Sequence, residues 1–384
     1  MGAPVGHPRS ETRLISVHVD TARTWRGGQH QVFLTVTGLC EIGHPAVLVA
    51  QASGELSRRA QEGLRTMALN PSGEFDVQAG WQLHRLLLSI VPDVVHLHDP
   101  MGIALMAMAL KMQPRLTPRP LIVASRRVDF HLKQNAFSRW KYRHVDVFIA
   151  VSRMIASMLV EDGIAADRIE VVHDGVNIST VDKTPAMDVH KELWLPHGSP
   201  IVGNVAALVA HKGQKALIEA AAIVVRQLPD VRFVIFGEGE LRATLERQVK
   251  DLGLDRHVFL PGFRADVLAL QKSFDVFAMS SLTEGLGSAM LDAMACGTPV
   301  VGTRTGGIPE AIEHERTGLL VRPNHADELA AAIIRLLQDP GLRTSLGAAG
   351  RAHVEAEFSV DRMVEGTLAV YESRLGARTL PTVI

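Results

Sequence analysis

One stretch in the second half of the chain combines two acids, three glycines and the start of a predicted helix. In residues 281–299, SLTEGLGSAMLDAMACGTP, Glu284 opens a loop after an apolar run, and Asp292 follows after seven intervening residues. Gly287 lets backbone N–H groups approach a ligand closely, and Ser288 is a suitable N-cap. Because a helix N-terminus favours negative charge, the loop predicts a phosphate or diphosphate site, with Glu284 at its mouth and Asp292 reaching back towards it.

Two shorter motifs in the same half point to the same kind of ligand. Lys212 lies in the segment AHKG, residues 210–213, directly after a predicted strand, and its ammonium group can place a compact positive charge on a diphosphate. The segment GGIPE, residues 306–310, predicts a tight turn that opens a helix. A single glycine-rich loop is weak support for such a site, but this ordered set within one half of the chain is strong support.

The first half carries a glycine turn of its own. In WRGGQH, residues 25–30, Gly27 and Gly28 follow a predicted strand and open a predicted helix. Taken alone, a Gly-Gly turn has either a structural or a ligand-binding role, and both interpretations stay open.

Histidines gather at the end of another predicted strand, in VVHLHDP, residues 94–100. Strand alternation places His96 and His98 on one face, so only one of them lies at the carboxyl tip of the strand. The alternatives are a ligand contact by His98 and a core histidine with backbone partners. A metal site is less favoured, because these histidines and Asp99 have no other obvious ligands nearby in the sequence.

Short apolar runs alternate with helix-like segments through almost the whole chain. This alternation is typical of parallel sheets covered by helices on both faces. The runs that predict strands are 14–19, 46–50, 94–97, 121–124, 147–151, 169–172, 201–205, 231–236, 258–260, 275–279, 299–302 and 318–321.

The alternation lapses between residues 176 and 199, which carry several Pro and Gly residues and one short predicted helix. We therefore expect an N-terminal domain over 1–185, a linker over 186–198, a C-terminal domain over 199–355 and a helical segment over 356–384. Two such α/β domains turn the carboxyl ends of their sheets towards one cleft, where ligands bind.

The motifs resemble those of the family 4 glycosyltransferases, which are retaining enzymes with the GT-B fold. The resemblance covers essentially the whole chain and is most specific from about residue 171, in VVHDGVN, to residue 321. It implies two Rossmann-like domains that face a cleft, with the last helix returning to the first domain. It also implies a nucleotide diphosphate sugar as donor, an unknown acceptor, and no metal or other cofactor.

The resemblance also assigns roles to particular residues. Glu284 would touch the donor sugar, Asp292 would hold the ribose, and Lys212 would stabilise the leaving diphosphate. His98 would contact the sugar, and Arg264, in LPGFR, would lie near the base. The residues that would surround the diphosphate are Gly27 and Gly28 from the first domain, and the backbone N–H groups of Leu286, Gly287 and Ser288 from the second.

Two positions depart from the family pattern. The second acid is usually Glu and is Asp292 here, and an Arg usually stands about five residues before the Lys, where this chain has Ala207. His211, or a basic residue from elsewhere in the chain, is then needed to replace that charge.

The function predicted in this way is transfer of a sugar from a nucleotide diphosphate sugar to a glycan, lipid or small molecule, with retention at the anomeric carbon. One alternative is a nucleotide-sugar epimerase of the same fold. Another is a degenerate scaffold that binds a nucleotide sugar without turning it over. The motifs do not indicate the base, the sugar or the acceptor.

The composition limits the partners of the chain. With 384 residues and a formal charge of −1, it gives no general argument for nucleic-acid binding. Two distant cysteines, Cys40 and Cys296, fit neither a disulfide framework nor a metal site. We find no signal-peptide pattern and no apolar run of membrane-spanning length. We therefore expect a cytoplasmic location.

One segment has a local excess of positive charge. Between Arg126 and His144, six basic residues alternate with aromatic residues. Such a segment is typical of a surface that contacts an anionic membrane or an acceptor phosphate, here at the inner face of the membrane. The alternative is a solvated helix face whose aromatic residues lie in the core.

Overall fold

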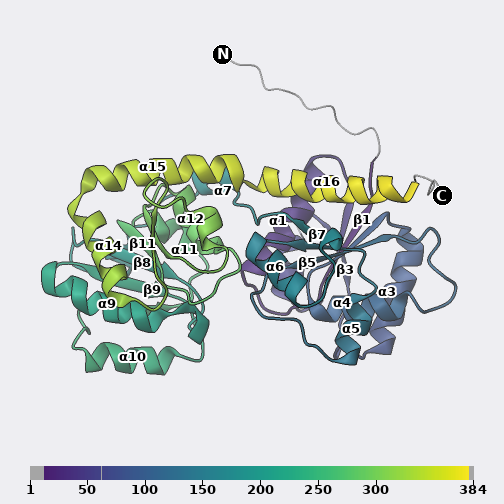
Figure 1. Cartoon of the computed structure of the whole chain (residues 1–384), viewed down its shortest axis with the longest axis horizontal. Helices are drawn as coiled ribbons and strands as arrows, with labels where there is room; N and C mark the ends of the chain where they lie inside the picture. The colour runs from purple at the N-terminus through teal and green to yellow at the C-terminus, as the bar shows by residue number, and fades with distance from the viewer. Residues whose placement is uncertain (1–12, 62, 380–384) are drawn as a thin grey trace, which may run out of the picture.

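The computed structural model describes residues 13–61 and 63–379. These residues form two parallel α/β sheets with helices on both faces, which confirms the predicted fold class. Figure 1 shows the two domains side by side. The long helix α15 (Pro340–Glu357) runs along one edge of the second domain, and α16 (Val360–Thr379) continues along the same edge of the first.

The first sheet has seven strands in the order β3-β2-β1-β4-β5-β6-β7, and all of its pairings are parallel. Most of its strands are buried along their whole length, because helices cover both faces and only apolar runs are stable there. The strands are β1 (Ser16–Asp20), β2 (Ala46–Ala50), β3 (Arg65–Ala68), β4 (Val94–Leu97), β5 (Leu121–Arg126), β6 (Val147–Ala150) and β7 (Ile169–Val171).

The helices of the first domain connect these strands. They are α1 (Gly27–Glu41), α2 (Glu55–Ala60), α3 (Val77–Ile90), α4 (Pro100–Ala109), α5 (Ala136–Tyr142), α6 (Arg153–Glu161), α7 (Ile178–Lys183) and the short 3-10 helix η1 (Ala166–Arg168).

The second sheet has six parallel strands in the order β10-β9-β8-β11-β12-β13. Its strands are β8 (Ile201–Val205), β9 (Arg232–Phe236), β10 (Val258–Gly262), β11 (Val276–Met279), β12 (Val300–Thr303) and β13 (Leu319–Val321). Its helices are α8 (Val189–Glu192), η2 (Ala210–Lys212), α9 (Gln214–Gln227), α10 (Arg242–Asp251), α11 (Val267–Gln271), α12 (Ser288–Ala295), α13 (Ile308–Ala311) and α14 (Ala326–Gln338).

The strand β3 was not predicted from the sequence. It lies at the edge of the first sheet, and its four residues, RTMA, are exposed or half-buried. An edge strand lacks a second neighbour and does not need the continuous apolar run by which the other strands were found.

The final helix brings the end of the chain back to the first domain. Val176 and Ser359 form an isolated bridge where the chain passes between the domains, and α16 then packs along α1. The side chain of Tyr371 on α16 is 1% exposed, so this helix contributes to the core of the first domain.

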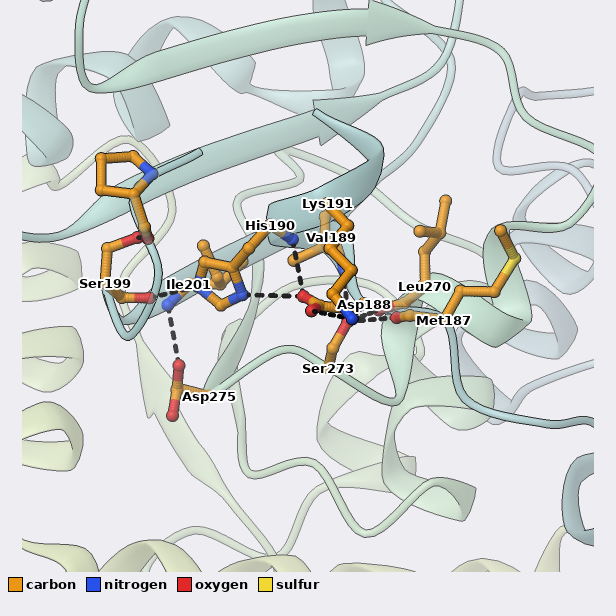
Figure 2. Close-up of polar contacts among 11 residues, drawn as sticks. Met187, Asp188, Val189, His190, Lys191, Ser199, Ile201, Leu270, Ser273 and Asp275 are labelled. Atoms are coloured by element: carbon orange, nitrogen blue, oxygen red, sulfur yellow. Dashed lines mark hydrogen bonds and ion pairs between the residues drawn. The ribbon is translucent and has the colours of Figure 1, made fainter. Parts of the chain in front are cut away.

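The segment that follows the first domain is held tightly to the second. Asp188 accepts a hydrogen bond from the backbone N–H of His190 at 3.0 Å and lies 3.1 Å from its ring (Figure 2). Ser273 donates its hydroxyl proton to the carbonyl of Met187 at 2.8 Å. The backbone N–H of Ile201, at the start of β8, donates to Asp275 at 2.8 Å. These bonds attach the segment to the amino edge of the second sheet.

The basic segment from Arg126 to His144 is only partly a surface. Lys141, expected as one of its solvent-facing charges, has a side chain that is 3% exposed and donates to Glu74 at 2.6 Å and to the carbonyl of Pro100 at 3.1 Å. The sequence prediction was wrong for this residue, because α5 turns this side of the helix towards α4. Lys133, Arg139 and Arg143 are exposed.

This arrangement predicts that substitution of two lysines of the same segment changes the free energy of unfolding by different amounts. Lys141→Met removes the partner of Glu74 and of a backbone carbonyl, so it should lower the free energy of unfolding by about 1–3 kcal/mol. Lys133→Met, at an exposed position, should change it by less than about 0.5 kcal/mol. Urea unfolding followed by circular dichroism measures both, and equal values would show that the Lys141 ion pair does not support the fold.

Candidate active site

The strand order of the second sheet reverses between β8 and β11, and this crevice contains the strongest candidate residues. Lys212 follows β8 and Glu284 follows β11. Their side chains form an ion pair with an Nζ–Oε2 distance of 2.5 Å and exposed fractions of 19% and 12%. Ser281 donates its hydroxyl proton to the same carboxylate at 3.2 Å. The structure therefore brings together two residues that are 72 positions apart in the sequence.

The loops that carry this pair are fixed to each other by backbone contacts. The N–H of Leu282 donates to the carbonyl of His211 at 2.7 Å, and the hydroxyl of Ser280 donates to the carbonyl of Lys212 at 3.1 Å. Gly213 has a φ of +67°, and a Cβ there would lie 2.0 Å from the carbonyl oxygen of Ser280. Only glycine allows this approach, so the segment AHKG is needed to position Lys212.

The glycine pair at 306–307 supports Glu284 from the other side. The N–H of Gly307 donates to the carbonyl of Glu284 at 3.0 Å. A Cβ on Gly306 would lie 2.0 Å from the same carbonyl oxygen. The segment GGIPE therefore packs directly beneath the loop that carries the acid.

The start of α12 offers free backbone donors beside this pair. Gly287, with a φ of +97°, forms the N-cap, so the prediction of Ser288 as N-cap was wrong by one residue. The N–H groups of Leu286, Gly287 and Ser288 donate to no acceptor within the described residues. Such donors, together with the partial positive charge of the helix end, are suited to binding an anion.

Asp292 lies on the same helix and is half-buried. Its carboxylate accepts no hydrogen bond from the described residues, and burial raises its pKa from 3.8 to about 7. Because the carboxylate loses part of its hydration there without gaining a protein partner, its ionised form is less favourable at this position than in water. A structural role as a simple helix support is therefore poorly matched to its surroundings.

The first sheet reverses its strand order between β1 and β4, and this crevice faces the start of α12. Gly27 begins α1 after β1, and a Cβ on it would lie 2.9 Å from the hydroxyl oxygen of Ser288. A Cβ on Gly28 would meet nothing within 4 Å. The glycine turn of the first domain therefore lies against the start of α12 in the second.

Three histidines line the crevice of the first sheet, and their hydrogen bonds form a chain. Arg127 donates to Nδ1 of His98 at 3.1 Å, because a guanidinium has only N–H groups to offer. His98 must then carry its proton on Nε2, which donates to Nδ1 of His18 at 3.0 Å. His18 in turn donates to the hydroxyl of Ser16 at 3.1 Å. Both ring nitrogens of His98 are therefore occupied by protein partners.

His96 lies beside this chain with its own partners. Its ring nitrogens bond Tyr371 of α16 at 2.6 Å and Ser125 at 2.7 Å. Burial lowers the pKa of His18, His96 and His98, so all three rings are neutral at physiological pH.

The three histidines are also the one group among the described residues with metal-ligand spacing. Each of their ring nitrogens already has a partner, and the guanidinium of Arg127 lies next to His98. The fixed positive charge of the Arg127 guanidinium would repel a metal ion at this distance, so the surroundings do not suit a metal site.

One aspartate, Asp20, and one ion pair at this crevice were missed by sequence reasoning. Burial and the nearby Asp99 raise the pKa of Asp20 to about 6. Arg127 is held by Asp174 at 2.9 Å, with exposed fractions of 13% and 11%. Asp20 is the first acid after an apolar run, and that position was the available signal. The pairing of Arg127 with Asp174 has no local signal.

A cavity of about 250 Å³ opens at this crevice. Its lining is partly charged or polar and partly apolar. The charged and polar lining residues include Asp20, Arg26, His98, Asp99, Arg126 and Arg127, and the apolar ones include Ile103, Leu132 and Phe148. It can hold a small polyol or sugar, with the rings and aliphatic chains covering its apolar face.

Polar contacts connect the two domains around the crevices. Thr283 donates to Asp129 at 2.6 Å. The carboxylate of Glu310 accepts from the N–H groups of Arg153 and Met154, at the start of α6, and lies 3.0 Å from His173. The acid of the segment GGIPE therefore acts at the domain interface.

Arg264 lies outside this cluster. Its guanidinium pairs with Asp266 at 2.7 Å and with Glu192 of α8 at 3.1 Å, and these bonds raise its pKa. It is positioned after β10, at the far edge of the second sheet.

Two family descriptions match the chain on either side of the domain boundary. "Glycosyltransferase Family 4" matches residues 25–180, and "Glycosyl transferases group 1" matches residues 188–353. The chain belongs to glycosyltransferase family 4. The matched residues include the glycine turn, the Lys212 segment and the acids of the α12 loop.

Several known proteins are similar to part of this chain. A GDP-mannose-dependent monoacylated alpha-(1-6)-phosphatidylinositol monomannoside mannosyltransferase of Corynebacterium glutamicum is 36% identical over 190 residues, 48% of this chain and 50% of its own length. A 2-deoxystreptamine glucosyltransferase of Streptomyces kanamyceticus is 32% identical over 253 residues, 64% of this chain and 65% of its own. The aligned region thus spans about half to two thirds of these two relatives.

A solved structure supports the fold over nearly the whole chain. Anabaena HepE, in complex with UDP and glucose, superposes with a TM-score of 0.80 at 20% identity, covering 94% of this chain and 100% of HepE. Within residues 13–61 and 63–379, no helix is long and apolar enough to cross a membrane.

The surroundings of Asp292 predict a pH-dependent stability difference. The folded protein holds its proton up to about pH 7, whereas the unfolded chain releases it near 3.8, so stability falls as pH rises through this window. Asp292→Asn cannot ionise and should be more stable than wild type at pH 8, by about 1 kcal/mol or more.

Thermal unfolding at pH 5 and pH 8 checks this expectation. The advantage of Asp292→Asn should shrink towards pH 5. Asp255→Asn, at an exposed position, is the control, and its difference in stability from wild type should be the same at both pH values. If wild type and Asp292→Asn are equally stable at pH 8, ionised Asp292 does not destabilise the folded protein, and the expectation is wrong.

Proposed function

We propose that this chain transfers a sugar from a nucleotide diphosphate sugar to an acceptor, with retention at the anomeric carbon. The main support is the Lys212–Glu284 ion pair, which lies at a switch point beside the free N–H groups of α12. Family membership and this arrangement point to the same reaction.

In this proposal the second domain binds the donor. The N–H groups of Leu286, Gly287 and Ser288 hold the diphosphate, and Asp292 accepts hydrogen bonds from the ribose hydroxyls. This use explains why a carboxylate without protein partners persists on α12. Arg264 would flank the base, with its guanidinium already oriented by Asp266 and Glu192.

The chemical step breaks the bond between the sugar and the diphosphate, so negative charge grows on the leaving group. Lys212 and the α12 donors stabilise that charge, and electrostatic stabilisation of this kind is the main contribution to the rate. Glu284 orients the donor sugar and the ammonium group of Lys212, and no side chain is assigned as a nucleophile.

The cavity of the first domain would hold the acceptor. It lies across from the start of α12 and has both polar and apolar walls. Because both ring nitrogens of His98 are occupied, a sugar hydroxyl that reaches one of them would have to replace Arg127 or His18.

Two other activities have the same fold and are separated by product analysis. An epimerase would convert the donor into a different nucleotide sugar without an acceptor, and a binding scaffold would release no nucleotide. The names of similar proteins include GDP-mannose and UDP, so GDP- and UDP-sugars are the first donors to test.

Lys212→Ala tests the proposed reaction most directly. Loss of one positive charge at the leaving group should lower kcat about a hundredfold, which corresponds to roughly 3 kcal/mol. Lys215→Ala, on the exposed face of α9, is the control and should retain wild-type turnover. Nucleotide release with GDP- and UDP-sugars measures the rates, and a Lys212→Ala variant as active as the control would remove Lys212 from the mechanism.

We also propose peripheral contact with an anionic membrane through a surface next to the acceptor cavity. Phe75, Val77 and Trp81, at the start of α3, are 48–72% exposed. The ring of Phe75 packs 4.3 Å from that of Phe137 on α5, so the two helices form one aromatic surface. Exposed basic residues also occur on α3, on α5 and in the segments that flank α5; they are Arg85, Lys133, Arg139 and Arg143.

Removing the basic residues of this surface should weaken binding to anionic vesicles. The triple variant Lys133→Gln, Arg139→Gln and Arg143→Gln should sediment less with phosphatidylserine vesicles at low salt, since each charge contributes roughly 1 kcal/mol near such a surface. A second triple variant, with Lys215, Arg226 and Lys250 changed to Gln, loses the same charge from the other domain and should sediment like wild type. Equal losses in both would indicate a general charge effect with no defined surface.

A further inference from the structure

The second domain supplies little net positive charge for a diphosphate. Lys212 is already neutralised by Glu284 at 2.5 Å, and Asp292 adds a second acid to the same region. Ala207, where the family pattern has Arg, adds no charge. If the proposed function is correct, a ligand with at least two negative charges must obtain a further cation from elsewhere.

Three arginines line the cavity on the opposite side of the cleft. Arg126 donates to the carbonyl of Phe130. Arg127 is held between Asp174 at 2.9 Å and His98 at 3.1 Å, and its charge is matched by that aspartate. Neither guanidinium can move to a ligand without breaking these bonds.

The third arginine is Arg26, and it differs from the other two. It is exposed, and within the described residues its side chain forms no hydrogen bond or ion pair. It is the N-cap residue of α1, but its side chain caps nothing. The positive charge of its guanidinium is therefore available to a ligand.

The position of Arg26 fits the diphosphate site. The next residue, Gly27, approaches Ser288 so closely that a Cβ on it would lie 2.9 Å from the serine hydroxyl. Consecutive Cα atoms are about 3.8 Å apart, so the backbone of Arg26 is within one arginine side-chain length of the start of α12. The guanidinium can therefore reach an anion bound at the N–H groups of Leu286 and Gly287.

We propose that Arg26 binds the donor diphosphate across the cleft, as the second cation beside Lys212. A planar guanidinium suits this role because it can contact two phosphate oxygens at once. The donor would then be held by both domains, and the charge missing at Ala207 would come from the first domain.

Arg304 is the alternative source of this charge. It follows β12 at the carboxyl edge of the second sheet, is exposed, and has no side-chain partner within the described residues. It does not line the cavity. It therefore serves as the matched comparison for Arg26.

Calorimetric titration with UDP, GDP, UMP and GMP tests the proposal. Arg26→Gln should raise the Kd of the diphosphate that wild type binds about tenfold, as expected for loss of one charge-assisted hydrogen bond. The Kd of the matching monophosphate should change much less. Arg26→Lys should recover part of the loss, and Arg304→Gln should bind like wild type.

Each other outcome has a defined meaning. A normal diphosphate Kd in Arg26→Gln, with a weakened one in Lys212→Ala, would overturn the role of Arg26 and leave the proposed function intact. A loss in Arg304→Gln alone would place the second cation in the C-terminal domain. A changed acceptor KM at a constant diphosphate Kd would assign Arg26 to the acceptor. If wild type binds none of UDP, GDP and ADP at millimolar concentration, both this proposal and the proposed function are wrong.

Discussion

A parallel sheet reverses its strand order at one place, and there the loops on either side diverge and leave a crevice. Both sheets of this protein place their polar side chains at that position. In the second sheet the crevice separates Lys212 from Glu284, and in the first it separates Asp20 from His98. Three other features hold the two crevices next to each other. They are the linker contacts at Asp188, the return of α16 to the first domain, and the close approach of Gly27 to Ser288.

The sequence predicted the elements and residues that have a local signal. Buried parallel strands are continuous apolar runs, so twelve of the thirteen strands were found, whereas the exposed edge strand β3 has no such run. The loop acids and glycines of the second domain were found because a strand, a glycine loop and a helix follow one another within twenty residues. Some contacts were missed because their residues meet only in the folded chain. Arg127 and Asp174 are 47 positions apart, and Tyr371 and His96 are 275 positions apart. Lys141 was misplaced because helix periodicity does not show which side of a short helix faces a neighbour.

Charge balance also depends on residues from distant parts of the chain. Lys212 and Glu284 are both largely buried, and each is tolerated because the other neutralises it. Arg127 and Asp174 do the same in the first domain, where they also fix the protonation of His98. Asp292 has no such partner. Among the acids of the described α12 loop region, it alone lacks a neighbouring positive charge. Residues at a binding site often keep such an unfavourable state because a ligand, absent from the free protein, completes their hydrogen bonds.

Several polar contacts between the domains would have to break for the domains to separate. Glu310 reaches the first turn of α6 through backbone N–H groups, and Thr283 reaches Asp129 through a single hydroxyl. If the domains moved apart, water would have to replace these bonds, including those of the Glu310 side chain, which is only 13% exposed in this arrangement. Closing has the opposite effect: it excludes water from the cleft, so each charge near the α12 helix start acts through a lower effective dielectric. An enzyme that stabilises its leaving group by fixed charges needs both states, an open one through which a large nucleotide sugar enters and a closed one in which those charges act most strongly.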